Sequence, residues 1–276
     1  MTAVEEEVGR YVDILGARTF FITMGTGAPV VLFHGGAPGT CSLVQWRFTL
    51  NPLAEAGFAV YAYDQPGSGL SDAAAEGSMD LRVAHALACL DAWGIERAHL
   101  IGNSIGAYVA ARLAIEHPER VAKLVIAAGT GLGPPGPPET EERARAFAQQ
   151  LREYTPSLTN MRDLFGSVVY HQELITGELV QLRYDMSLRA LASQQARNAT
   201  GGGGMRPLVD ELQKIQAQTL VVWGAQDQSS TTEKALLVAQ AIPGAELHIF
   251  DQCAHWVMWD HADRFNTLVA DFLSAP

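Results

Sequence analysis

The chain has 276 residues, of which 48% are hydrophobic and 18% are charged, and its formal net charge is −11 at neutral pH. This length and apolar content suit one large domain, or one domain that carries an insertion. The negative charge argues against a nucleic-acid partner or an anionic membrane surface, because both would repel an acidic protein. An anionic substrate would therefore need cations placed within its own binding site.

The three cysteines, Cys41, Cys89 and Cys253, are widely spaced. They match neither a disulfide framework nor a zinc-binding pattern, so we expect reduced thiols and no metal site. The first residues, MTAVEEEVGR, lack the basic start and apolar run of a signal peptide. No segment approaches the ~18 uninterrupted apolar residues of a membrane helix. These features predict a soluble, cytoplasmic protein.

Short apolar segments begin the chain and recur along it. Residues 11–15 and 19–24 flank Gly16-Ala17-Arg18 and predict an opening β-hairpin. The later runs are rich in Val, Ile and Leu and end in turn residues, which is typical of buried strands in a parallel sheet. These runs cover residues 29–33, 58–63, 98–102, 123–128, 219–223 and 246–250.

Helical patterns separate several of these runs. Residues 81–93 carry an apolar stripe that ends at Gly94, and the alanine-rich residues 105–117 end before Pro118. This alternation predicts an α/β protein with a mostly parallel, doubly wound sheet. It stops at residues 131–140, the proline-rich segment GLGPPGPPET.

A helical insertion is expected in the middle of the chain. Residues 141–200 are helical in pattern, and four glycines, Gly201–Gly204, lead back towards the next strand. We expect residues 131–214 to form a helical cap (lid) domain, inserted into a core domain made of residues 1–130 and 215–276. Flexible joints at both ends suit a lid over a site, although the glycines also fit a loose surface loop.

The segment with the clearest chemistry is Gly102-Asn103-Ser104-Ile105-Gly106, which matches G-x-S-x-G. It stands between a predicted strand and a predicted helix, as the nucleophile turn of the α/β-hydrolase fold requires. The serine hydroxyl then projects into open space while the flanking glycines relieve crowding. We therefore predict Ser104 as the nucleophile and the amide of Ile105 as one oxyanion donor.

The second oxyanion donor is expected in the loop His34-Gly35-Gly36-Ala37-Pro38-Gly39, which follows a predicted strand. Small residues there let a backbone amide approach a developing negative charge. We assign this donor to Gly36, and we expect His34 to organise the loop.

A serine nucleophile needs a base, and the base needs an acid that orients it; on this fold the chain order is serine, acid, histidine. His255 lies in a loop after the last predicted strand and fits the base. Asp227 follows the preceding strand and fits the acid. Asp251, shortly before the histidine, is the rival acid.

With these residues in place, the chain resembles the meta-cleavage-product hydrolases, which cleave C–C bonds in ring-opened aromatic catabolites. The resemblance covers nearly the whole chain and is strongest in HGGAPG, GNSIGA, PERVAKLVIAAGTGLG and LHIFDQCAHWVMWDHADRFNTLVADFL. It implies an α/β-hydrolase fold with a helical cap and a serine triad that cleaves a 2-hydroxy-6-oxo-hexa-2,4-dienoate type product. It further implies a small anionic dienoate as substrate, no cofactor, and a homodimer or larger homo-oligomer.

The resemblance also implies the substrate contacts. Asn103 stands where the family has a polar residue against the dienoate, and Arg183 stands where the cap arginine binds the 2-hydroxy/oxo end. Trp256 resembles an aromatic residue of the same pocket, and Gly35 and Gln45 are the remaining expected contacts, although Gln45 departs from the asparagine expected near its position at the carboxylate site. A guanidinium suits an α-keto carboxylate because it offers two parallel donors and a fixed charge.

Some positions depart from the family pattern. Ala37 replaces a frequent third glycine, Ala254 replaces the glycine before the triad histidine, and residues 228–231 replace a basic-aromatic-apolar-proline run. These departures concern the substrate more than the fold. Arg189 competes with Arg183 for the cap role. A carboxylesterase or lactonase would use the same triad without a cap arginine, and a non-hydrolytic small-molecule binder is a third alternative.

Overall fold

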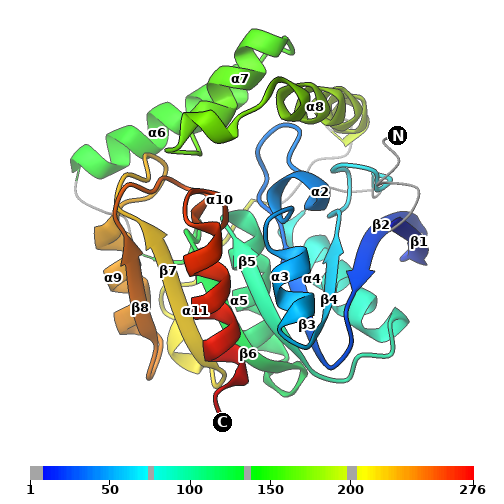
Figure 1. Ribbon diagram of the computed structural model, residues 1–276, viewed down its shortest axis with the longest axis vertical. Coiled ribbons are helices and arrows are strands. Elements are labelled where there is room, and N and C mark those ends of the chain that lie inside the picture. The colour runs from blue at the N-terminus through cyan, green and yellow to red at the C-terminus, as the bar shows by residue number, and fades with distance from the viewer. Residues whose placement is uncertain (1–8, 74–77, 134–137, 198–203) are drawn as a thin grey trace.

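The computed structural model describes residues 9–73, 78–133, 138–197 and 204–276. Its strands form one eight-stranded sheet in the order β1-β2-β4-β3-β5-β6-β7-β8 (Figure 1). Strand β2 is antiparallel to both of its neighbours, β1 and β4, and all other neighbouring strands are parallel. The strands are β1 (Gly9–Ile14), β2 (Ala17–Met24), β3 (Ala28–Phe33), β4 (Phe58–Tyr63), β5 (Ala98–Asn103), β6 (Val121–Ala127), β7 (Gln218–Gly224) and β8 (Glu246–Phe250).

The sheet confirms the predicted hairpin, the six predicted apolar strands and the mostly parallel arrangement. The boundaries differ by one or two residues. For example, Ala128 was expected in a strand, but it has a φ of +46° and lies outside β6. Because this residue follows the strand directly, its left-handed backbone turns the chain at the edge where the site forms.

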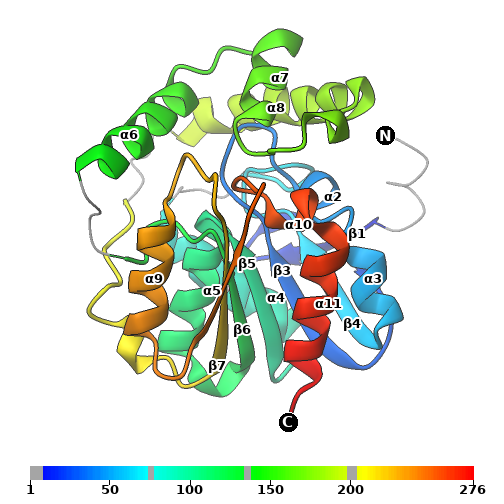
Figure 2. The ribbon, with the colours of Figure 1, turned by 60° about the vertical axis from the view of Figure 1, so that its left-hand side comes forward.

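Helices cover both faces of the sheet (Figure 2). The face under α4 (Met79–Ala92), α5 (Ile105–Glu116) and α9 (Thr232–Ala241) forms one buried apolar cluster. The opposite face, under α3 (Leu50–Glu55) and α11 (Ala262–Ser274), forms the other. Each fully buried aliphatic or aromatic side chain in these clusters contributes about 1.5–3 kcal/mol through the hydrophobic effect.

Three further helices lie over the edge of the sheet at which the parallel strands end: α6 (Pro138–Arg152), α7 (Leu158–Gly166) and α8 (Gly177–Arg197) (Figures 1 and 2). They account for the helical pattern predicted over residues 141–200. Most of the glycine run predicted as a joint, residues 201–203, lies outside the described residues. The division into core and cap domains stays a prediction.

The covering helices are attached to the core by specific contacts. The amide of Trp256 donates to the carbonyl of Val168 at 2.9 Å, and the Asp260 carboxylate accepts from the amides of Tyr170 and Ala254 at 2.9 and 2.8 Å. Short elements complete the fold: α2 (Ser42–Gln45) and α10 (Val257–Asp260). Within the described residues, no helix combines the length and hydrophobicity needed to cross a membrane.

Candidate active site

Ser104 lies at the sharp turn between β5 and α5, with φ +56° and ψ −121°. Such a backbone is strained for a residue with a side chain, and strain of this kind is concentrated at functional sites. A Cβ added to Gly102 would lie 2.5 Å from the Gly106 carbonyl oxygen, and one added to Gly106 would lie 2.1 Å from the Phe33 carbonyl oxygen. Both flanking positions therefore require glycine.

Gly36 and Ile105, the residues predicted to supply the oxyanion donors, are in contact and both line the cavity with Ser104. A Cβ placed on Gly36 would be 3.3 Å from Cδ1 of Ile105. Ile105 begins α5, so its amide has no partner within the helix. The Gly35 amide donates to Gln45 Oε1 at 2.7 Å and is therefore engaged within the protein, so the assignment of the second donor to Gly36 stays a prediction.

His34 stabilises this loop from within the core. Its Nε2 accepts from the Gln65 amide at 2.9 Å, and the Gln65 side chain donates back to the His34 carbonyl. Burial lowers the pKa of His34, so the ring is neutral at pH 7 and can accept that bond. This agrees with an organising role.

His255 and Asp227 form the expected acid–base pair. His255 Nδ1 donates to Asp227 Oδ2 at 2.7 Å, and both side chains are buried. The second oxygen, Oδ1, accepts from the amides of Ser229 and Ser230 at 2.8 and 3.2 Å. The rival acid, Asp251, is exposed and accepts from Gln226 instead. The geometry therefore favours Asp227.

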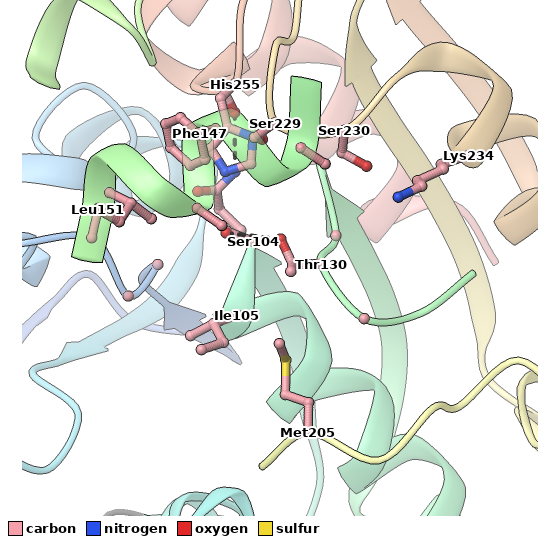
Figure 3. Close-up of a pocket in the computed structure, with 18 of the residues that line it drawn as sticks. Ser104, Ile105, Thr130, Phe147, Leu151, Met205, Ser229, Ser230, Lys234 and His255 are labelled. Atoms are coloured by element: carbon pink, nitrogen blue, oxygen red, sulfur yellow. Dashed lines mark hydrogen bonds between the residues drawn. The ribbon is translucent and has the colours of Figure 1, made fainter. Parts of the chain in front are cut away.

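Ser229 is a member of this constellation that the sequence did not single out as a site residue. Its hydroxyl donates to Asp227 Oδ1 at 2.7 Å, and its oxygen lies 2.9 Å from His255 Nδ1 (Figure 3). The only signal for it was the departure from the family pattern at residues 228–231. The Ser229 hydroxyl therefore bridges Asp227 and His255, in addition to the direct hydrogen bond between these two residues.

Thr130 is another side chain that the sequence did not identify. Its hydroxyl is 3.1 Å from Ser104 Oγ, and its amide donates to the Ser104 carbonyl at 3.2 Å. In Figure 3, Thr130 lies beside Ser104 and His255 lies above it. The Ser104 hydroxyl is therefore hydrogen-bonded to Thr130, and His255 lines the same cavity.

This cavity has a volume of about 570 Å³ and opens between the sheet edge and α6. Its apolar wall includes Phe147 and Leu151 of α6 together with Ile105 and Met205 (Figure 3). The Phe147 ring packs against the imidazole of His255, with centroids 6.3 Å apart. A site of this size and lining suits a mainly apolar small molecule with a few polar groups.

Asn103 connects three segments around the cavity. Its Nδ2 donates to the carbonyls of Ala127 and His255 at 3.0 and 3.1 Å, and its Oδ1 accepts from Gln45 Nε2. Of the residues predicted to contact substrate, Gly35, Asn103 and Trp256 line the cavity. Gln45 lies behind Asn103, and both ends of its amide are engaged by protein groups.

Arg183 is completely buried in α8, an unusual position for a guanidinium. Its Nε donates to the Pro38 carbonyl at 3.2 Å, and its Cζ atom lies 4.6 Å from the centroid of the Phe165 ring and 5.0 Å from that of the Trp256 ring. Nη1 and Nη2 have no hydrogen-bond partner. Burial lowers the pKa of Arg183 to about 9, so it remains charged at pH 7.

The surroundings of Arg183 contain a second polar group without a partner. The Thr40 hydroxyl is buried, lines the cavity and has no hydrogen-bond partner. It follows Gly39, where an added Cβ would collide with the Arg183 carbonyl. The competing arginine, Arg189, is exposed and donates to the Gly69 carbonyl at 3.3 Å. Arg183 is therefore the buried arginine of α8, next to Thr40 of the cavity wall but not itself a lining residue, and its role as the cap arginine stays a prediction.

Comparison with known proteins agrees with this geometry. The model of the alpha/beta hydrolase fold family matches residues 28–262. The 2-hydroxymuconate semialdehyde hydrolase of Pseudomonas sp. (strain CF600) is 36% identical, over 97% of this chain and 94% of that protein. The chain belongs to the meta-cleavage product hydrolases.

Other relatives in this family give the same result. The 2-hydroxy-6-oxo-6-phenylhexa-2,4-dienoate hydrolase of Comamonas testosteroni is 35% identical, over 90% of this chain and 88% of that protein. The solved meta-cleavage product hydrolase of Pseudomonas fluorescens IP01 superposes with a TM-score of 0.85 at 30% identity, over 97% and 98% of the two chains. The predicted fold and family are thereby confirmed.

Proposed function

We propose that this meta-cleavage product hydrolase cleaves the C5–C6 bond of a 2-hydroxy-6-oxo-hexa-2,4-dienoate by means of Ser104, Asp227 and His255. The observation that carries the proposal is the buried, charged Arg183 with two unpartnered nitrogens. Such a charge is costly unless an anion or a carbonyl oxygen satisfies it. The α-keto carboxylate end of a dienoate supplies both groups. The relatives named after such dienoates add support.

In the first step, the substrate binds with its 2-hydroxy carboxylate end towards Arg183 and Asn103. Moving the 2-hydroxyl proton to C5 converts the dienol into a 2,6-dioxo-hex-3-enoate. The new 2-oxo group is conjugated with the remaining double bond, so it can accept an electron pair from C5. The positive charge of Arg183 favours the electron density that develops there.

In the second step, an oxygen nucleophile attacks the C6 carbonyl. His255 takes the proton from that nucleophile, and Asp227 holds the imidazole in the tautomer that can accept it. The amides of Gly36 and Ile105 stabilise the oxyanion on C6. Collapse breaks the C5–C6 bond, and its electron pair moves onto the 2-oxo group as a 2-hydroxy-dienoate re-forms.

Either Ser104 itself or a water molecule activated by the triad attacks C6. Attack by Ser104 gives an acyl-enzyme that a water molecule hydrolyses, whereas direct attack by water gives the acid in one stage. In both cases one water is consumed, and the products are a 2-hydroxypenta-2,4-dienoate and a carboxylic acid. Isotope incorporation from labelled water with a trapped acyl-enzyme distinguishes the two routes.

The test uses a panel of ring-fission dienoates, whose visible absorbance is lost on cleavage. Wild-type protein should bleach at least one of them rapidly, and Ser104→Ala and Arg183→Ala should each be severely impaired. Arg189→Ala is the matched control, because it removes an exposed arginine from the same helix. No bleaching of any dienoate would contradict the proposal.

An ester or lactone hydrolase is the second candidate. The same triad and oxyanion donors serve ester hydrolysis, and the chain also superposes on Est816, an N-acyl homoserine lactone degrading enzyme, with a TM-score of 0.74 at 28% identity. Nitrophenyl-ester cleavage that requires Ser104 but is indifferent to Arg183, without dienoate cleavage, would favour this second candidate.

A further inference from the structure

Asp260 is a buried carboxylate at the end of α10 that accepts hydrogen bonds from two separate parts of the chain. Its Oδ2 accepts from the amide of Ala254, the residue before His255, at 2.8 Å. Its Oδ1 accepts from the amides of Tyr170 and His171 at 2.9 and 3.0 Å. These two donors belong to the segment between α7 and α8, which lies over α10 in both ribbon views (Figures 1 and 2). One carboxylate therefore joins the histidine loop to the covering helices.

The backbone around His255 is held at two further points. The His255 carbonyl accepts from Asn103 Nδ2 at 3.1 Å. The amide of the next residue, Trp256, donates to the Val168 carbonyl at 2.9 Å. Residues 168–171, here named the covering segment, are therefore bonded to the loop on both sides of the histidine, directly on one side and through the carboxylate on the other.

The covering segment also borders the cavity, because Val168 lines it together with His255 and Trp256. The bonds to this segment therefore help to set where the imidazole stands relative to a bound substrate. A general base has to come within about 2.6–3.2 Å of the atom whose proton it takes. A displacement of about 1 Å can lower a rate about 10²-fold. Fixing the backbone next to His255 thus bears directly on the rate.

The two sides can be held together only by an acceptor with two oxygens. The three donors at Asp260 are backbone N–H groups, and an ionised carboxylate offers about four lone-pair sites and no donor. Asparagine has the same shape, but one end of its amide is a donor and would face a backbone N–H. Asp260→Asn therefore keeps the bond to Ala254 or the bonds to the covering segment, and loses the other.

We propose that Asp260 is a positioning residue for His255, which fixes the loop of the base to the covering segment. Asp260 is not among the residues that line the cavity, so it acts through the backbone of Ala254 and not on the substrate. A carboxylate with a structural role alone would affect stability and leave the turnover of the folded enzyme unchanged. The inference rests on the proposed function for the role of His255 as the base.

The experiment measures kcat and KM of Asp260→Asn on 4-nitrophenyl butyrate and on a ring-fission dienoate, well below the Tm of the variant. Displacement of the base should lower kcat about 10- to 100-fold on each substrate that wild-type protein cleaves, while KM stays within about twofold. The same substitution in a His255→Ala background should change the residual single-turnover rate less than about twofold, because no base is left to misplace.

Two controls separate positioning from stability. Asp251→Asn makes the same chemical change at an exposed carboxylate of the same loop, and it should leave kcat unchanged. Lys123 lies near the beginning of β6, away from the edge that carries the site, and its ammonium donates to the carbonyls of Phe272 and Ala275 at 2.9 and 2.6 Å. Lys123→Met should lower Tm by several degrees without changing kcat.

A loss of about fivefold or more in kcat for Asp260→Asn, absent in the His255→Ala background, supports the positioning role. A smaller loss, a loss confined to KM, or an equal loss in the His255→Ala background overturns it. Wild-type protein that cleaves the ester but no dienoate contradicts only the proposed C–C hydrolysis, and the ester still tests Asp260. Wild-type protein that cleaves neither substrate overturns both.

A second variant carries the test if Asp260→Asn gives no folded protein. Asp260→Glu keeps both acceptor oxygens and moves them by one methylene, so it should fold with a kcat about threefold below that of wild type. A loss of about twofold or more that disappears in the His255→Ala background supports the positioning role. An unchanged kcat overturns it.

Discussion

Replacing Arg183 by methionine should separate substrate binding from folding. A fall in the pKa of this guanidinium from 12.5 to about 9 corresponds to about 5 kcal/mol against its charged form in the folded protein. At pH 7 the side chain is protonated both folded and unfolded, so this penalty is fully present. It is relieved only as the pH rises above about 9, where the folded state begins to release the proton.

Methionine removes that penalty and fills much of the same space. The substitution also loses two cation–π contacts and the hydrogen bond to the Pro38 carbonyl, each of which stabilises the folded protein by about 1 kcal/mol. The net gain for Arg183→Met is about 2 kcal/mol, or ~4–8 °C in Tm for a domain of this size. The variant should nevertheless lose a factor of about 10²–10³ in kcat/KM on the dienoate, because a bidentate charged contact is lost.

Thermal melts and dienoate bleaching measure the two effects on the same preparations. Arg189→Met, an exposed site on the same helix, should change neither quantity appreciably. A variant at Arg183 that melts several degrees lower while keeping its kcat/KM would refute the reasoning, since the arginine would then be a structural cation.

Substitutions at three further positions test the site. Gly106→Ala should lower Tm by several degrees or prevent folding, because its Cβ would meet the Phe33 carbonyl at 2.1 Å; a wild-type melt would contradict this. Ser229→Ala should lower kcat/KM about 10-fold with Tm nearly unchanged, and Ser229→Thr should restore it; equal activity in all three proteins would show that Ser229 does not assist Asp227 and His255. Thr130→Val should raise kcat/KM on an activated ester about fivefold, because the Ser104 hydroxyl would be released towards His255, and a fall would show that Thr130 assists the reaction.

Much of the site could be predicted because its parts are local in sequence. Ser104 and Ile105 belong to one strand–turn–helix motif, and Gly36 lies in one short loop after one strand. In a parallel sheet all these loops emerge at the same edge, so strand order and motif are enough to bring them together. Asp227 and His255 follow the last two strands, β7 and β8, so their loops also emerge at this edge.

Ser229 and Thr130 could not be found in this way. A serine or threonine in a loop is common, and its role depends on which atom lies within about 3 Å of it. The Thr130 distance is set by how the turns after β5 and β6 pack together, and the Ser229 distance by how the loops after β7 and β8 pack together. The sequence signal at residues 228–231 was only a departure from a family pattern.

By itself, the sequence determined the order of strands and helices, the strand–turn–helix motif at Ser104 and the family, and it proposed the triad members, since these depend on residue periodicity and on short motifs. Only the tertiary structure decided that Gln45 lies behind Asn103, that Arg183 is buried with unpartnered nitrogens, and that Lys234 faces the cavity. These outcomes depend on packing between α8, α9 and the loops of the sheet. Side-chain burial and hydrogen-bond satisfaction are properties of contacts distant along the chain, which no local pattern specifies.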